Sequence, residues 1–364
     1  MVKTLSSKKS DVGVKVAIGI SGGVDSAVAA ALLKEWGYDV TGAYLQCWDF
    51  DRPGCGGDVD RNDAIHIATT LEIKFKHLDF IEEYRDLVMS YFYSEYEAGR
   101  TPNPDVLCNK EIKFGLFLDW ALESGFDYVA TGHYAGLKRI TDASGNSCVQ
   151  LLSGADKGKD QSYFLYRLNQ DQLKHALFPL GDMQKEDVRK KAKEVGFRIY
   201  DKPDSTGICF IGEVNLQTFL KERVKAKRGD VLSIEGNVIG YHEGAWFYTI
   251  GQRHGFTVTE YAGRPLYVVD KDVNNNQLVV GSKEDASKDI FYVNDLNWIC
   301  EKPVLPFESL VRIRNLGKFY SAKISMGEGG QSEVITDEPL FGVAPGQSAV
   351  FYEDGRVLGG GIIV

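Results

Sequence analysis

The chain carries a glycine-rich turn of the kind that binds phosphate. Residues 16–20 form the apolar run of a buried strand and lead directly into Ser-Gly-Gly-Val-Asp-Ser at 21–26 and an alanine-rich helix. Glycines at such a turn let backbone N–H groups close around an anion, and the start of the helix adds partial positive charge. The turn lacks the Gly-Lys-Ser/Thr ending of a Walker A loop. We expect a phosphate site, with Asp25 reaching a Mg²⁺ ion that bridges the phosphates.

Two cysteines have neighbours suited to sulfur chemistry. Cys108 follows the proline-restricted loop Thr-Pro-Asn-Pro-Asp-Val-Leu and is expected at the start of a helix. A helix N-terminus and the ammonium groups of Lys110 and Lys113 would lower the pKa of its thiol, and Asp105 is a candidate for proton transfer. Cys209 lies among turn-forming residues in the segment Asp-Ser-Thr-Gly-Ile-Cys-Phe.

The other four cysteines have no comparable surroundings, and we expect buried, inert side chains at Cys47, Cys55, Cys148 and Cys300. Six cysteines in 364 residues do not suggest a disulfide scaffold. The sequence contains no CxxC, which argues against a zinc ribbon, a thioredoxin-type motif and the paired cysteines that often hold an iron–sulfur cluster.

The elements that must position these residues follow from the hydrophobic pattern. Short apolar runs at 14–20, 40–45 and 73–78 alternate with helical patterns at 24–36, 59–69, 81–96 and 110–124, and another strand ends at 129–132. Strands separated by helices of this length predict a doubly wound parallel sheet covered on both faces. Ligands of such sheets bind beyond the carboxyl ends of the strands, which favours a functional role for His133 beside Gly132.

The pattern changes near residue 212. Short alternating segments follow, separated by turn signals such as Glu-Gly-Asn at 235–237 and Glu-Asp-Gly at 353–355, with one helical stretch at 215–226. This spacing predicts antiparallel hairpins in small sheets or a barrel. We place the boundaries near 212 and 288, which gives domains at 1–212, 213–287 and 288–364.

The charge pattern leaves two interpretations open. A net charge of −9 does not suggest nucleic acid, yet segment 185–228 carries twelve lysines and arginines against seven acidic residues. Such a run is either a solvated helix face or a site for a polyanion. The N-terminus has no apolar signal-peptide core, and no stretch approaches the ~20 apolar residues of a membrane span, so we expect a cytoplasmic protein.

Segment 21–26 resembles the SGGxDS signature of the ATP pyrophosphatase (PP-loop) superfamily, whose members cleave ATP to AMP and pyrophosphate while adenylating an oxygen. The wider set of motifs is similar to the tRNA-specific 2-thiouridylase (MnmA) family: SGGVDS, TPNPDVLCNKEIKFG, ATGHYA, KGKDQSYFLYRL, DSTGICFIG, YTIGQRHG and GVAPGQSAVFY. These motifs run in order from Gly19 to Tyr352, nearly the whole chain. The resemblance implies a Rossmann-like PP-loop catalytic domain, a small central β-rich domain and a C-terminal β-barrel.

The resemblance also implies roles for the residues that match its motifs. Cys108 would be the nucleophile, and Cys209 would receive sulfur as a persulfide. The implied ATP-binding residues are Gly19, Ile20, Ser21, Gly22, Gly23, Val24, Asp25, Ser26, Leu45 and Gly132. The implied tRNA contacts are Asn103, Pro104 and Asp105 at the target base, with His133, Lys159, Asp160, Gln161, Arg314, Asn315 and Gln347 elsewhere.

The reaction implied is thiolation of the wobble uridine in tRNAs for Lys, Glu and Gln. ATP and Mg²⁺ would serve to adenylate O2 of the uracil, and sulfur from a Cys209 persulfide would displace AMP. Cys108 would either free sulfide or resolve the persulfide, with a transient disulfide to Cys209. A cysteine desulfurase or a relay protein would supply the sulfur. Two alternatives stand beside this interpretation: an ATP-dependent amide-forming ligase, which needs no cysteine pair, and a non-catalytic RNA-binding protein that senses ATP.

Overall fold

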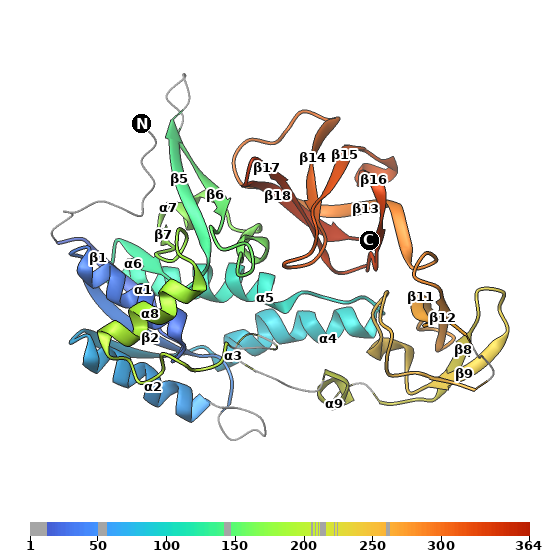
Figure 1. The fold of residues 1–364 in the computed structure, drawn as a ribbon, viewed down its shortest axis with the longest axis horizontal. Coiled ribbons are helices and arrows are strands. Elements are labelled where there is room, and N and C mark those ends of the chain that lie inside the picture. The colour runs from blue at the N-terminus through green and yellow to red at the C-terminus, as the bar shows by residue number, and fades with distance from the viewer. Residues whose placement is uncertain are drawn as a thin grey trace.

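The computed structural model describes residues 13–49, 57–141, 147–204, 207, 209, 211, 216–221, 223, 225–259 and 263–364. Figure 1 shows an N-terminal α/β part in blue to green, a central part in yellow and a C-terminal barrel in red. The expected fold class is confirmed: a Rossmann-like parallel sheet is followed by a small β-rich domain and a closed β-barrel. Cys55, one of the cysteines expected to be inert, lies outside the described residues.

The N-terminal sheet is parallel and has the strand order β3-β2-β1-β4-β7. Its strands are β1 (Lys15–Gly19), β2 (Asp39–Gln46), β3 (Lys74–Asp79), β4 (Tyr128–Ala130) and β7 (Ala176–Leu177). Successive residues of β1 point to opposite faces, since Val16 and Ile18 belong to one core and Ala17 to another. A strand that is apolar on both faces must be covered on both, as the sequence pattern predicts.

Helices cover both faces. The core around Val16 packs against α1 (Val24–Glu35), α2 (Gly57–Thr70) and α8 (Lys185–Val195). The opposite core packs against α3 (Ile81–Tyr84), α4 (Ser90–Glu97), α5 (Pro104–Leu107), α6 (Phe117–Glu123), α7 (Gln170–Lys174) and two π-helical segments, η2 (Arg85–Met89) and η3 (Cys108–Leu116). A short 3₁₀ turn, η4 (Ser162–Leu165), joins the same core.

The barrel closes on itself through six strands. They are β13 (Ser287–Trp298), β14 (Phe307–Arg312), β15 (Tyr320–Met326), β16 (Ser332–Phe341), β17 (Ser348–Glu353) and β18 (Arg356–Ile363), and the pairing of β13 with β18 completes the circle. A 3₁₀ turn, η6 (Glu328–Gly330), links β15 to β16. The barrel has its own apolar core.

A hairpin of the N-terminal part extends the barrel sheet. Strands β5 (Ala135–Thr141) and β6 (Ser147–Ser153) pair with each other, and Leu151 and Leu152 of β6 pair with Val357 and Arg356 of β18. In Figure 1 this hairpin rises between the parallel sheet and the barrel. The two parts of the molecule therefore share one continuous set of backbone hydrogen bonds.

The central domain is a five-stranded sheet with the order β10-β9-β8-β12-β11. Its strands are β8 (Gly229–Leu232), β9 (Val238–His242), β10 (Thr257–Val258), β11 (Tyr267–Asp272) and β12 (Gln277–Gly281), with a 3₁₀ turn η5 (Ala245–Phe247). Helix α9 (Leu216–Lys221) precedes it and is shorter than the helical stretch expected at 215–226, part of which lies outside the described residues.

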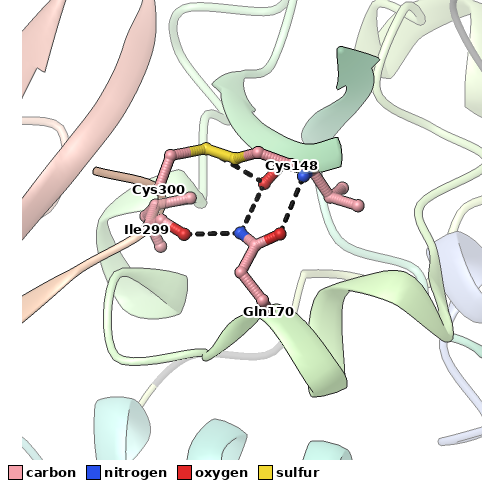
Figure 2. Close-up of a disulfide and its surroundings, with 5 residues drawn as sticks. Cys148, Gln170, Ile299 and Cys300 are labelled. Carbon is pink, nitrogen blue, oxygen red and sulfur yellow. Dashed lines mark hydrogen bonds between the residues drawn. A yellow bond between two sulfur atoms is a disulfide. The ribbon is translucent and has the colours of Figure 1, made fainter. Parts of the chain in front are cut away.

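A disulfide fastens the hairpin to the barrel. Cys148 of β6 is bonded to Cys300, just after β13, and their Cα atoms are 6.0 Å apart (Figure 2). The Gln170 side chain accepts a hydrogen bond from the Val149 N–H at 2.8 Å and donates to the carbonyl oxygens of Val149 and Ile299 at 3.0 and 2.5 Å. The prediction of inert thiols at Cys148 and Cys300 is therefore wrong, because their partnership exists only once the hairpin has joined the barrel sheet.

Candidate active site

The glycine-rich turn lies where β1 passes into α1. Gly22 has φ +76°, and a Cβ there would lie 2.3 Å from the carbonyl oxygen of Asp60, so only glycine fits. The Ser26 hydroxyl accepts from the Ser21 N–H at 3.2 Å and donates to the Gly23 carbonyl at 3.1 Å. Among the described residues, no side chain caps α1 at Gly23. The first amide groups of α1 are thus suited to an anion.

The carboxyl ends of neighbouring strands complete this edge. Gly132, just after β4, lies so close to α1 that a Cβ would be 2.7 Å from the Ser26 nitrogen. Leu45 lies near the end of β2 and is buried. The His133 ring contacts the Thr131 hydroxyl at 2.7 Å through Nδ1, and burial together with a nearby lysine lowers its pKa well below the usual range. His133 is therefore a neutral, buried imidazole rather than a charged surface group.

Charged side chains gather around Asp25. Its carboxylate accepts hydrogen bonds from the Tyr134 hydroxyl at 2.7 Å and from the Lys185 ammonium at 2.7 and 2.9 Å. Lys185 also pairs with Asp204 at 2.8 Å, and Asp204 pairs with Lys159 at 2.6 Å. Burial disfavours ionisation of Asp204, but the lysine hydrogen bonds outweigh it and lower its pKa to about 2.

The side chains of this cluster could hold a Mg²⁺ ion only if phosphate oxygens supplied some of its ligands. The described residues contain no group of three or more His, Cys, Asp or Glu side chains arranged to hold a metal. Asp25 alone supplies one carboxylate, and Mg²⁺ typically takes one or two carboxylates together with phosphate oxygens. Lys185 would have to leave the carboxylate of Asp25 for a phosphate oxygen when such an ion binds.

Much of the basic charge predicted at 185–228 is paired. The Lys202 ammonium donates to the Gly22 carbonyl at 3.1 Å and pairs with Asp60 and Asp63 at 2.7 and 2.8 Å. Arg189 bonds Asp204 at 2.8 Å. Lys202 and Arg189 thus hold residues 200–204 beside the phosphate loop.

The two predicted cysteines meet. The Sγ atoms of Cys108 and Cys209 are 3.8 Å apart although 101 positions separate them in the chain. The Asp105 carboxylate accepts a hydrogen bond from the Cys209 N–H at 3.0 Å, and the Tyr84 hydroxyl donates to the Cys209 carbonyl at 2.8 Å. Cys47, also a free thiol, is buried in the same core as Cys108, and burial raises its pKa.

The position of Cys108 in its helix differs from the prediction. The helix begins earlier, at Pro104, because Asn103 caps it by accepting a hydrogen bond from the Val106 N–H at 3.4 Å. Cys108 therefore lies one turn inside, away from the exposed amide groups. The expectation that helix start and lysines lower the pKa of Cys108 is wrong, since complete burial raises it.

The environment that favours a thiolate is found at Cys209 instead. The hydrogen bond from Cys108 is the main cause that lowers the pKa of Cys209, and Lys113 adds to it against the cost of burial. Burial raises the pKa of Asp105, which suits this carboxylate to accept a proton. Lys110 pairs with Glu111 at 2.8 Å instead of contacting either thiol.

The barrel holds the loop before Cys108. The Gln347 amide donates to the carbonyl oxygens of Thr101 and Pro102 at 2.9 and 3.1 Å. Gln347, Arg314 and Gln252 help to line an open pocket of about 290 Å³ between the central part and the barrel. Arg314 is exposed, and its guanidinium donates to the Gly342 carbonyl at 3.0 Å, whereas Asn315 is half-buried.

The three predicted tRNA contacts at 159–161 have different surroundings in the structure. Asp160 is fully buried and pairs with Arg312 of the barrel at 3.0 Å, so its side chain lies away from any surface. Gln161 is half-buried, and its side chain accepts a hydrogen bond from the Tyr134 N–H at 3.1 Å, whereas Lys159 has 40% of its side chain exposed. Asp160 thus positions neighbouring residues through its buried side chain, which also accepts hydrogen bonds from the Gly154 and Ser162 N–H groups.

Sequence reasoning missed several side chains that organise the site. Tyr84, Tyr134, Lys185 and Asp204 contact the expected residues. Tyr134 and Asp204 lie inside the motifs ATGHYA and DSTGICFIG, but the roles that the resemblance implies fall on their neighbours, and Tyr84 and Lys185 lie outside those motifs. The surplus of lysines after residue 185 was the only available signal for Lys185.

Family models match the chain in three consecutive parts. They are described as tRNA methyl transferase HUP domain (residues 14–213), tRNA methyl transferase PRC-barrel domain (217–282) and Aminomethyltransferase beta-barrel domain (288–363). No described helix is long and apolar enough to cross a membrane.

Two curated relatives are similar over nearly their whole length. The tRNA-specific 2-thiouridylase MnmA of Francisella philomiragia is 44% identical over 359 residues, 96% of this chain and 99% of the relative. That of Listeria monocytogenes is 44% identical over 366 residues, 99% of this chain and 96% of the relative. Among solved structures, U34-tRNA thiolase NcsA from Methanococcus maripaludis is similar at 17% identity and TM-score 0.37, covering 60% of this chain and 67% of that one. That structural likeness is too weak to bear on function.

Proposed function

Because this chain belongs to the tRNA-specific 2-thiouridylase family, it is an enzyme that transfers sulfur to tRNA, and we propose that it converts the wobble uridine to 2-thiouridine through an adenylated base and a cysteine persulfide. The observation that carries this proposal is the 3.8 Å approach of the Cys108 and Cys209 sulfurs. Lys202, which precedes Cys209 by seven positions in the chain, contacts Gly22 of the phosphate loop. Activation and sulfur transfer therefore share one site.

In the first step, the target uridine leaves its stack and enters the site, because O2 cannot be reached in a stacked base. O2 attacks the α-phosphorus of ATP, an O–P bond forms, and pyrophosphate leaves. The ATP site comprises Gly19 to Ser26, Leu45 and Gly132. The amide groups at the start of α1 and the Lys185 ammonium stabilise the negative charge on the phosphates. Asp25 would hold a Mg²⁺ ion, which would supply further neutralisation of negative charge on the phosphates.

In the second step, a donor persulfide transfers its outer sulfur to the Cys209 thiolate and leaves as a thiolate. The terminal sulfur of Cys209 attacks C2 of the base, and AMP departs with the electron pair of the C–O bond. The Cys108 thiolate then attacks the Cys209 sulfur, which releases thiolated base and leaves a Cys108–Cys209 disulfide. If Cys108 attacks the Cys209 persulfide before that persulfide attacks the base, free sulfide is released and the same disulfide forms. The sulfide then attacks C2, and AMP departs with the electron pair of the C–O bond. A dithiol reductant restores both thiols.

Asp105 is suited to move protons in this sequence. Its carboxylate contacts the Cys209 backbone at 3.0 Å, and burial raises its pKa, so it accepts the proton lost by a thiol or by N3 of the uracil. Asn103 and Pro104, on the loop held by Gln347, would contact the target base.

The RNA surface would extend over the catalytic domain and the barrel. We propose contacts from His133, Lys159, Gln161, Arg314, Asn315 and Gln347, with Asp160 acting on its neighbours through the buried pair with Arg312. The substrates would be the anticodon stem-loops of tRNAs for Lys, Glu and Gln, and the sulfur donor a cysteine desulfurase or relay protein in the cytoplasm. The catalytic, central and barrel domains would span 1–212, 213–287 and 288–364.

The decisive experiment incubates the protein with unmodified tRNA, ATP, Mg²⁺ and sulfide or a persulfide donor, followed by mass spectrometry of nucleosides. We expect 2-thiouridine from the wild type, and no product above background from Cys108→Ser or Cys209→Ser with a persulfide donor, while both variants bind ATP. Cys47→Ala is the matched control and keeps the product, because Cys47 has no part in the scheme. Undiminished product from either serine variant with that donor would refute the two-thiol mechanism.

The same reagents separate the alternatives. An amide-forming ligase would remain active as the double serine variant with an ammonia source. A non-catalytic ATP sensor would release no pyrophosphate when tRNA is added, whereas the proposed enzyme releases it in a tRNA-dependent manner.

A further inference from the structure

The helix that carries Cys108 is wound as a π-helix. Residues Cys108–Leu116 form η3, and the Phe117 N–H that ends it donates to the Ile112 carbonyl, five positions back. In an α-helix a side chain lies over the residue four positions away, but i→i+5 bonding brings residue i+5 over residue i. The winding therefore places Lys113 on the same face as Cys108, which an α-helix would not do.

Side chains from elsewhere hold this wide turn in place. The Gln172 amide donates to the carbonyl oxygens of Lys110 and Phe114 at 3.0 and 2.8 Å. The same side chain closes the capping box of α7 by accepting from the Asn169 N–H at 3.0 Å. At Gly115 a Cβ would lie 3.1 Å from the Lys110 carbonyl, so the small residue accommodates the tight backbone. Rare π segments of this kind are frequent at functional sites.

Lys113 reaches the reacting sulfur from this position. Its side chain makes a hydrogen bond with Cys209, and it lies near Cys108 and Asp105. Burial disfavours its charge, but attraction to these three groups outweighs burial and raises its pKa. Other titratable groups that interact with Lys113 come from several elements: Cys47 after β2, Asp105 of α5 and His133 after β4. Tyr84 of α3 lies near both thiols.

We propose that Lys113 is a catalytic residue of this enzyme that holds the Cys209 sulfur as an anion, both as thiolate and as persulfide, and that the π-helix exists to bring it there. The inference rests on the function proposed above. A cation that donates to sulfur favours the anionic form, which is the nucleophile in persulfide loading and in attack on the base. The proton of the Cys209 thiol passes to Asp105 or to solvent, and the sulfur keeps its electron pair.

The test measures the Cys209 thiol directly, without tRNA or ATP. The reduced protein is alkylated with iodoacetamide between pH 5 and 10, and the Cys209 peptide is quantified by mass spectrometry. We expect wild type to react at lower pH than an ordinary thiol, and Lys113→Met to shift the profile upward, with about tenfold slower alkylation at neutral pH for each pKa unit. Lys113→Arg keeps the charge and should restore much of the rate.

Lys110→Met is the matched control, because Lys110 lies in the same helix but pairs with Glu111. Its profile should match wild type. Gln172→Leu removes the support of the wide turn while keeping Lys113, and should shift the profile in the same direction as Lys113→Met. Identical profiles for wild type and Lys113→Met, or equal shifts for both lysine variants, would overturn the proposal. If the Lys113 shift is present but wild type makes no 2-thiouridine, the proposed function fails and the thiol chemistry stands.

Discussion

Reduction of the Cys148–Cys300 disulfide should destabilise the native arrangement of hairpin and barrel. The bond closes a loop with a sequence separation of 152, and the chain-entropy relation gives about 5 kcal/mol for a loop of that length. The Gln170 hydrogen bonds survive reduction and contribute about 1 kcal/mol each, so the hairpin remains docked while the unfolded chain gains freedom. We expect the free energy of unfolding to fall by up to about 5 kcal/mol.

The assay is urea denaturation monitored by circular dichroism, with and without dithiothreitol. The urea midpoint of the wild type should fall on reduction. The Cys148→Ser/Cys300→Ser double variant should have the midpoint of the reduced wild type, with or without the reductant. Among the described cysteines the other three are free, and the double variant shows any effect of the reductant that does not come from this bond. Equal midpoints for reduced and unreduced wild type would refute the reasoning, since loop closure would then have no energetic consequence.

Three further perturbations follow from the geometry. Gly132→Ala should lower pyrophosphate release by about a hundredfold, because its Cβ would lie 2.7 Å from the Ser26 nitrogen and displace the phosphate loop; near-normal turnover would contradict the close contact. Asp160→Asn should cost about 3–5 kcal/mol in urea denaturation by leaving Arg312 buried without its partner, and an unchanged midpoint would show that the pair is dispensable. Asp204 has a pKa of about 2 in the folded protein, below its unfolded value, so the stability it contributes is complete above about pH 4 and is lost as pH falls toward 2. Asp204→Asn should therefore reduce the pH dependence of the free energy of unfolding between about pH 4 and 2, which stepwise acid titration monitored by circular dichroism checks.

The alternation of strands and helices was predictable because period and length are local properties of the sequence. Val16 and Ile18 belong to a run that only a strand buried on both faces explains, and glycines at 22 and 23 mark the turn that follows. The hairpin at 135–153 was not recognised, because its pairing with β18 joins residues that lie far apart in the chain. Long-range pairing of this kind leaves no periodic signal.

The site was predictable as a set of positions but not as an electrostatic arrangement. Proline and asparagine before Cys108 marked a capped helix, yet the start was placed too late, and this error reversed the expected shift in its pKa. Which of two thiols is favoured as an anion depends mainly on the hydrogen bond from Cys108 to Cys209, to which Lys113 adds, and the position of Lys113 depends on the winding of one helix. Residue spacing does not distinguish an α-helix from a π-helix, because one short sequence is compatible with the period of either helix.

The hairpin shared with the barrel ties two binding events together thermodynamically. Gly132 contacts the start of α1, and the same short stretch of chain continues into β5, whose partner strand β6 is hydrogen-bonded to β18. A ligand that shifted the barrel relative to the parallel sheet would therefore also act on the backbone beside the glycine-rich turn. If RNA on the barrel raises the affinity for ATP by some factor, ATP must raise the affinity for RNA by that same factor.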